Sequence, residues 1–143
     1  MAPNLFRILL TLVSLYAFLY GKRDERLVSA ILVLGVIATE LILPPVHDRF
    51  QGVETNLMMV DTAVFAGFLW VALRSDRFWP LWVAGLQLTS ILGHVMKAVD
   101  SDLFSRAYAA ALVFWFYPML LVIAVGTWRN VRRTRKQAQP ALA

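Results

Sequence analysis

Long apolar runs separated by short charged stretches are the feature that most limits how this chain can fold. The runs cover residues 5–20, 27–46, 57–73, 78–99 and 107–128. A bilayer core of about 30 Å needs about 20 mostly apolar residues per helix, so each run has roughly the length of a membrane span. A chain of 143 residues with 59% hydrophobic and 16% charged residues is also too apolar for a water-soluble domain. We therefore predict an all-α integral membrane protein with a bundle of five transmembrane helices.

The apolar runs are continuous rather than alternating. Residues 31–38 and 119–125 contain no polar side chain, whereas a strand of a membrane barrel alternates apolar and polar residues. Helices are then the remaining way to satisfy the backbone hydrogen-bonding groups in lipid. The absence of cysteine excludes disulfides, thiolate metal sites and cysteine nucleophiles.

Lysine and arginine are distributed unevenly between the two ends of the predicted bundle. One end receives ten of the fourteen: Lys22, Arg23, Arg26, Arg74, Arg77, Arg129, Arg132, Arg133, Arg135 and Lys136. The other end receives four: Arg7, Arg49, Lys97 and Arg106. Because cytoplasmic loops carry the excess of Lys and Arg, the count predicts an N-terminus outside and a C-terminus in the cytoplasm. Residues 1–128 are predicted to form one membrane domain and residues 129–143 a basic cytoplasmic tail.

The predicted tail carries five cations directly after the last span. They are Arg129, Arg132, Arg133, Arg135 and Lys136. Such a cluster favours anionic lipid headgroups by about 1 kcal/mol per residue near the membrane surface. Its simpler interpretation is a topological anchor. The basic residues are not gathered on a soluble module, so nucleic acid is not predicted as a partner.

Five ionisable residues fall within or at the ends of the predicted spans. They are Arg7, Glu40, Asp61, His94 and Lys97. A charged side chain costs about 2.5 to 3.5 kcal/mol near the centre of a membrane helix, so each of the five needs a partner or a purpose. The predicted topology places all five in the outer half of the membrane. The sequence therefore predicts a polar cluster there.

The fourth predicted helix carries a stripe of mostly small residues. Gly85, Thr89, Gly93 and Lys97 recur every four positions, a spacing that lets a second helix approach closely. We therefore expect the fourth helix to be central, with Glu40 and Asp61 facing it. His94 and Lys97, three residues apart, would meet these carboxylates from neighbouring faces of that helix.

Three interpretations of the polar cluster stay open. In the first, the charges neutralise one another and only specify how the helices pack. In the second, they line a pocket, open to the outer face, that binds a small solute or passes protons. In the third, Glu40, Asp61 and His94 ligate a metal ion, although no local spacing motif supports this and the two nearby cations oppose it.

The sequence contains no motif that identifies a reaction. A Walker loop and a dinucleotide fingerprint are both missing, and no serine has a neighbouring base, so neither a cofactor nor a catalytic residue is predicted. In general layout the chain resembles small inner-membrane proteins of bacteria. We therefore expect a multi-pass inner-membrane protein that works as an oligomer and whose outer-half pocket binds or passes a small solute or protons. The alternatives are an accessory subunit of a larger membrane complex and an enzyme acting on an isoprenoid or other lipid.

Overall fold

The computed structural model describes residues 2–42, 53–99 and 105–139, and this part of the chain is helical and without strands. Its helices are α1 (Ala2–Tyr20), α2 (Arg23–Ile42), α3 (Val53–Arg74), α4 (Trp79–Val99) and α5 (Ser105–Ala138). The prediction of five helices and no strands is confirmed for these residues. One segment among them, Thr55–Arg74, is long and apolar enough by itself to cross a membrane.

The helices extend beyond the apolar runs that predicted them. α1 begins at Ala2 and α2 at Arg23, while residues 43–46 of the second run lie outside the described residues. α5 does not stop at Trp128 but continues to Ala138, so the described part of the basic tail is helical. A search for apolar runs detects only the apolar part of a helix. Polar turns at the ends of the same helix are therefore missed.

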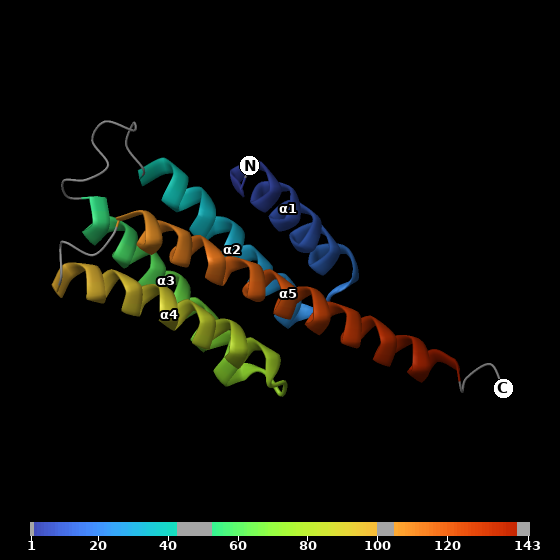
Figure 1. Cartoon of the computed structure of the whole chain (residues 1–143). Coiled ribbons are helices and arrows are strands. Elements are labelled where there is room, and N and C mark those ends of the chain that lie inside the picture. Colours follow the sequence, from blue (N-terminus) through green and yellow to red (C-terminus); the bar gives the residue numbers. More distant parts are fainter. Residues whose placement is uncertain (1, 43–52, 100–104, 140–143) are drawn as a thin grey trace.

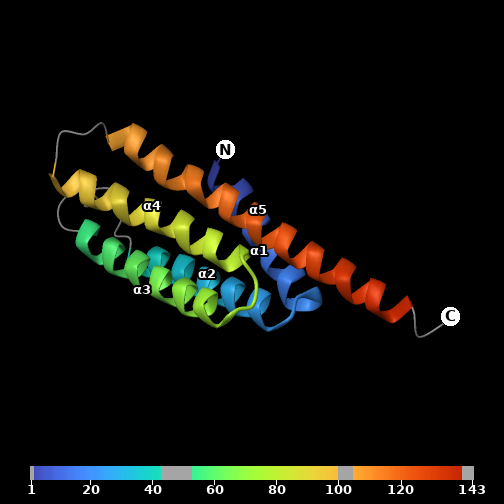
Figure 2. The same ribbon diagram turned by 90° about the horizontal axis from the view of Figure 1, so that it is seen from below.

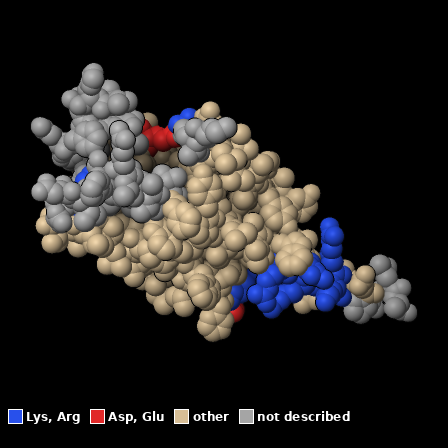
Figure 3. Space-filling view, in the orientation of Figure 1, with Lys and Arg blue, Asp and Glu red and all other residues tan. Residues whose placement is uncertain are grey.

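Successive helices run in opposite directions and form a closed arrangement (Figures 1 and 2). α3 packs between α2 and α4, α5 packs between α4 and α1, and α2 contacts both α1 and α5. The expectation that α4 is central is therefore wrong. α4 contacts mainly two helices, α3 and α5, whereas α2 and α5 each contact three. One end of the bundle, which we call the basic end, holds the α1–α2 and α3–α4 connections and the cationic turns of α5 (Figure 3).

The interior of the bundle contains an unusual share of polar side chains. The buried apolar residues are Leu10, Ala17, Val28, Leu32, Val64, Phe68, Val71, Val83, Ala84, Met119, Leu120 and Ile123. The buried polar residues are Ser14, Glu25, Ser29, Gln87, Ser90, His94, Thr127 and Asn130. Large apolar residues cover the outside, including Leu12, Leu34, Leu92 and Leu121, each more than half exposed. Apolar side chains thus cover the outside of the bundle, while several polar side chains lie among the apolar ones inside.

Two glycines let α2 and α3 approach closely. A Cβ atom at Gly35 would lie 2.6 Å from Val64 Cγ2, and one at Gly67 would lie 3.2 Å from the Ile31 side chain. The glycine predicted to serve this purpose, Gly85, faces outward instead, with no atom within 4 Å of its ideal Cβ position. Close helix approach thus occurs at the α2–α3 contact, and Gly85 takes no part in one.

We predict that Gly35→Leu lowers the stability of the purified protein by about 1 to 3 kcal/mol, because the added side chain meets Val64 in a filled contact. Gly85→Leu is the matched control and should leave stability unchanged or slightly raised, since leucine has the higher helix propensity. Thermal unfolding followed by circular dichroism measures both changes. Equal melting temperatures for the two variants would contradict the described α2–α3 contact.

Candidate functional site

The carboxylate of Asp61, on α3, is held by three side chains from one face of α4. Ser90 Oγ donates a hydrogen bond to Asp61 Oδ2 at 2.8 Å, and Gln87 Nε2 donates one to Oδ1 at 3.1 Å. His94 Nε2 lies 2.9 Å from Oδ2. Positions 87, 90 and 94 are three and four residues apart and so share a helix face. One carboxylate therefore joins α3 to two turns of α4.

This group of four residues, which we call the Asp61 cluster, lies inside the bundle. The Asp61 side chain is 15% exposed and the His94 side chain 5%. The pairing of Asp61 with His94 follows the sequence-based expectation. Gln87 and Ser90 were not predicted as members, although their spacing from His94 places them on the face that meets Asp61. A carboxylate removed from water needs several donors, and the cluster supplies them.

A cavity of about 180 Å³ lies beside the Asp61 cluster, between the helices. Its polar lining residues are Thr39, Glu40, Asp61 and Gln87, and its apolar ones are Phe6, Leu32, Gly35, Val36, Val64 and Phe116. Gln87 is 1% exposed, and its Oε1 atom has no hydrogen-bond partner among the described residues. The cavity thus has a mostly apolar wall and a buried acceptor that is not satisfied.

Glu40 forms a separate ion pair. Its Oε1 lies 2.7 Å from Arg7 Nη2, with the two side chains 49% and 62% exposed. Glu40 therefore faces α1, and the expectation that it faces α4 is wrong. Lys97 lies half-buried in the last turn of α4. The predicted cluster is divided into an Arg7–Glu40 pair and an Asp61–His94 pair. Glu40 from the first pair and Asp61 from the second line the same cavity.

The described residues do not bring together three metal-ligating side chains. No group of three His, Asp or Glu residues there has an arrangement that could hold a metal ion. Glu40, the third ligand of the metal hypothesis, is paired with Arg7 instead of joining Asp61 and His94. The arrangement provides hydrogen-bonding groups rather than a coordination site.

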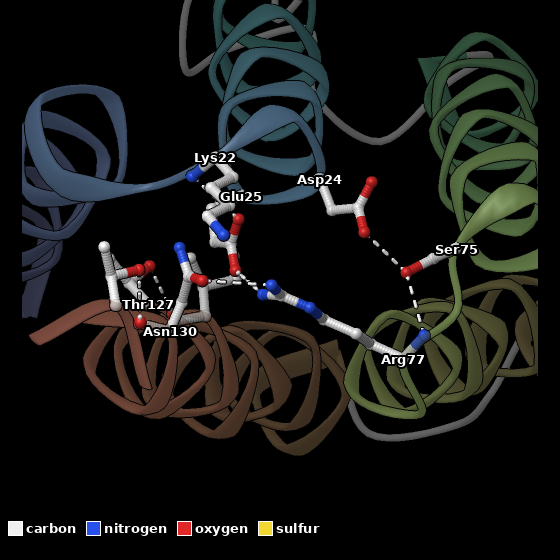
Figure 4. A network of polar contacts seen from close by, with 9 residues as sticks. Lys22, Asp24, Glu25, Ser75, Arg77, Thr127 and Asn130 are labelled. Atoms are coloured by element: carbon white, nitrogen blue, oxygen red, sulfur yellow. Dashed lines mark hydrogen bonds and ion pairs between the residues drawn. The ribbon is translucent and has the colours of Figure 1, made fainter. Parts of the chain in front are cut away.

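A second polar network, not predicted from the sequence, lies at the basic end (Figure 4). Arg77 donates from Nη1 to Glu25 Oε1 at 2.6 Å and from Nη2 to Asn130 Oδ1 at 3.0 Å. Glu25 is fully buried and Asn130 is 2% exposed. The guanidinium of Arg77 therefore connects α2 to α5 from the segment that precedes α4. Sequence reasoning counted Arg77 only as a topological charge, because nothing in the pattern indicated a buried partner.

Glu25 also caps its own helix. Its Oε2 accepts a hydrogen bond at 3.0 Å from the backbone N–H of Lys22, the residue before α2. An acidic side chain at the third helical position that reaches back to the N-cap is one half of a capping box. Next to it, Asp24 accepts a hydrogen bond at 2.6 Å from Ser75 Oγ, which ties the start of α2 to the α3–α4 connection. One helix N-terminus thus organises the basic end.

No family model matches the chain, and neither the curated proteins nor the solved structures contain a significant match. The function is therefore inferred from the site itself.

We predict that Glu25→Ala destabilises the purified protein by about 3 kcal/mol, because Arg77 loses its buried counter-charge and Lys22 its capping partner. Arg23→Ala alters an exposed residue of the same turn and should change stability by less than about 0.5 kcal/mol. Chemical denaturation measures both. Equal midpoints would show that the network at the basic end does not stabilise the fold.

Proposed function

We propose that this chain is a five-span inner-membrane protein whose cavity beside Asp61 binds a small, mostly apolar molecule that carries a hydrogen-bond donor. The proposal depends mainly on a cavity with a mostly apolar wall that is lined by Asp61 and by Gln87, whose buried Oε1 has no hydrogen-bond partner among the described residues.

The exposed apolar side chains of the bundle support membrane insertion of all five helices. Leu12, Leu34, Leu92 and Leu121, from four different helices, are each more than half exposed. A soluble monomer rarely leaves extended apolar surface uncovered, whereas lipid covers it at no cost. In Figure 3, the visible Lys, Arg, Asp and Glu residues lie towards the two ends, with apolar and uncharged residues between them. Polar residues turned inward, such as Gln87 and His94, lower the hydropathy of α4 without placing a polar side chain in lipid.

The distribution of cations supports an orientation with the basic end in the cytoplasm. The turns of α5 from Arg129 to Lys136 and the connections that hold Lys22 and Arg77 gather at this end. Positive residues concentrate on the cytoplasmic side of membrane proteins. The Arg7–Glu40 pair and the Asp61 cavity would then lie towards the outer surface.

The size of the cavity limits the ligand to a small molecule. A volume of 180 Å³ holds about six water-sized groups, at about 30 Å³ each. A buried acceptor without a partner costs about 1 to 3 kcal/mol, so a ligand donor that reaches Gln87 Oε1 would offset that cost. The apolar lining, which includes Val36 and Val64, would contact the rest of the ligand.

Two other functions would use the same residues differently. If the Asp61 cluster only specifies packing, the cavity stays without a ligand and changes to Asp61 alter stability alone. If the chain is an accessory subunit, its exposed apolar faces meet partner proteins. Neither alternative requires a cavity beside Asp61 and Gln87, which is why we prefer ligand binding.

We predict that native mass spectrometry of the protein, gently extracted from its own membrane, detects a bound small molecule. Val36→Phe, which fills the cavity but leaves the Asp61 cluster intact, should abolish the adduct, as should Asp61→Asn. Leu34→Phe, on an exposed residue of the same helix as Val36 that does not line the cavity, should retain it. Accumulation of each variant is measured in parallel to exclude loss of folding.

The proposal is contradicted if the wild-type protein carries no adduct, or if Val36→Phe keeps it. Co-elution with a larger protein complex and without a small molecule would instead favour the accessory role.

A further inference from the structure

We infer that a second cavity, at the basic end between the start of α4 and α5, binds the headgroup and first acyl carbons of one anionic phospholipid. This inference depends on the proposed membrane location, but not on the Asp61 cavity. The second cavity has a volume of about 460 Å³. Arginines form part of its lining, and apolar and aromatic residues form most of the rest. It is the more spacious of the two cavities described.

The cationic lining consists of Arg77, Arg129 and Arg133. Arg77 is already engaged by Glu25 and Asn130. Arg129 and Arg133 are four residues apart on one face of α5, and within the described residues neither has an ion pair. Asp76 is the single carboxylate in the lining and offsets part of this charge. Two exposed guanidinium groups therefore remain available to a phosphate, the group that arginine binds best.

The apolar lining continues from the arginines along both helices. Trp82 is 69% exposed, Leu121 64% and Val125 43%. Trp79 lies over α5 at Gly126, where a Cβ atom would come within 2.9 Å of the indole ring. The indole Nε1 of Trp79 is buried and has no hydrogen-bond partner among the described residues. The cavity thus combines an apolar wall with two cations.

This combination fits an anionic phospholipid better than a soluble anion. At about 30 Å³ per group, 460 Å³ holds about 15 water-sized groups, enough for a phosphate headgroup and the start of a chain. A free phosphate would leave the tryptophan and leucine surface uncovered. In the proposed orientation the arginines lie at headgroup depth, and the apolar wall extends from there towards the lipid tails. The tryptophans of this wall then lie at the membrane interface, where tryptophan is enriched in membrane proteins.

A specific site can be separated from general attraction to the membrane surface. Diffuse attraction is worth about 1 kcal/mol for each cation near anionic lipid, whichever residue carries it. Arg132 and Arg135 lie on the same turns of α5 as Arg129 and Arg133 but do not line the cavity, and the Arg132 guanidinium lies 4.8 Å from the centre of the Trp128 ring. These two residues therefore provide a control of equal charge.

The experiment is a titration of the detergent-purified protein with phosphatidylglycerol, with bound lipid counted by native mass spectrometry. We expect the double variant Arg129→Gln/Arg133→Gln to bind phosphatidylglycerol at least about tenfold more weakly than wild type. Arg132→Gln/Arg135→Gln should stay within about twofold of wild type. Val125→Trp, which fills the apolar part of the cavity and keeps every charge, should also weaken binding. Phosphatidylcholine and millimolar inorganic phosphate should not compete.

Equal losses in the two arginine double variants would overturn the inference in favour of diffuse attraction. Effective competition by inorganic phosphate would overturn it in favour of a soluble anion, and absence of phosphatidylglycerol binding to wild type would remove the site altogether. The lipid differs in mass from the small ligand proposed for the Asp61 cavity. Loss of one adduct in the arginine or Asp61 variants, with retention of the other, therefore shows which of the two proposals has failed.

Discussion

The hydrogen bonds between Asp61 and one face of α4 are the interaction on which the cavity depends. In the proposed membrane location, the hydrophobic effect would not drive helices together, so close packing and interhelical hydrogen bonds would have to do so. Asp61 provides these bonds by accepting from Gln87 and Ser90 and by contacting His94. The same contacts hold the amide of Gln87 by its nitrogen, and its oxygen has no hydrogen-bond partner among the described residues. Packing and proposed ligand binding therefore share one carboxylate.

The two ends of the bundle are stabilised by different means. At the basic end, Glu25 caps α2 and holds Arg77, which in turn contacts α5 through Asn130. This network fixes three segments of the chain on one side of the molecule. At the other end, the half-exposed Arg7–Glu40 pair joins α1 to α2. The cavity is lined by Glu40 of this ion pair, so the proposed ligand would enter from the end that holds the Arg7–Glu40 pair.

The helices and the Asp61–His94 contact could be predicted from the sequence, because apolar runs locate helices and a buried charge needs a partner. The partner of Glu40 could not be predicted. When a helix is apolar on most sides, its sequence does not show which face meets which neighbouring helix. For the same reason, Gly85 was expected at a helix contact but faces outward. Glu25 resembled an ordinary charged helix start, and only the fold shows that it is buried.

Labelling of single cysteines with a membrane-impermeant maleimide in intact cells tests the proposed five-span arrangement most directly, because the chain has no cysteine of its own. We expect labelling of cysteines that replace exposed residues at the outer end, namely Asn4, Thr55 and Val99. We expect labelling only after permeabilisation for cysteines that replace exposed residues at the basic end, namely Lys22, Asp76 and Lys136. Labelling of positions 4 and 22 from the same side would mean that α1 does not cross the membrane and would contradict the five-span account.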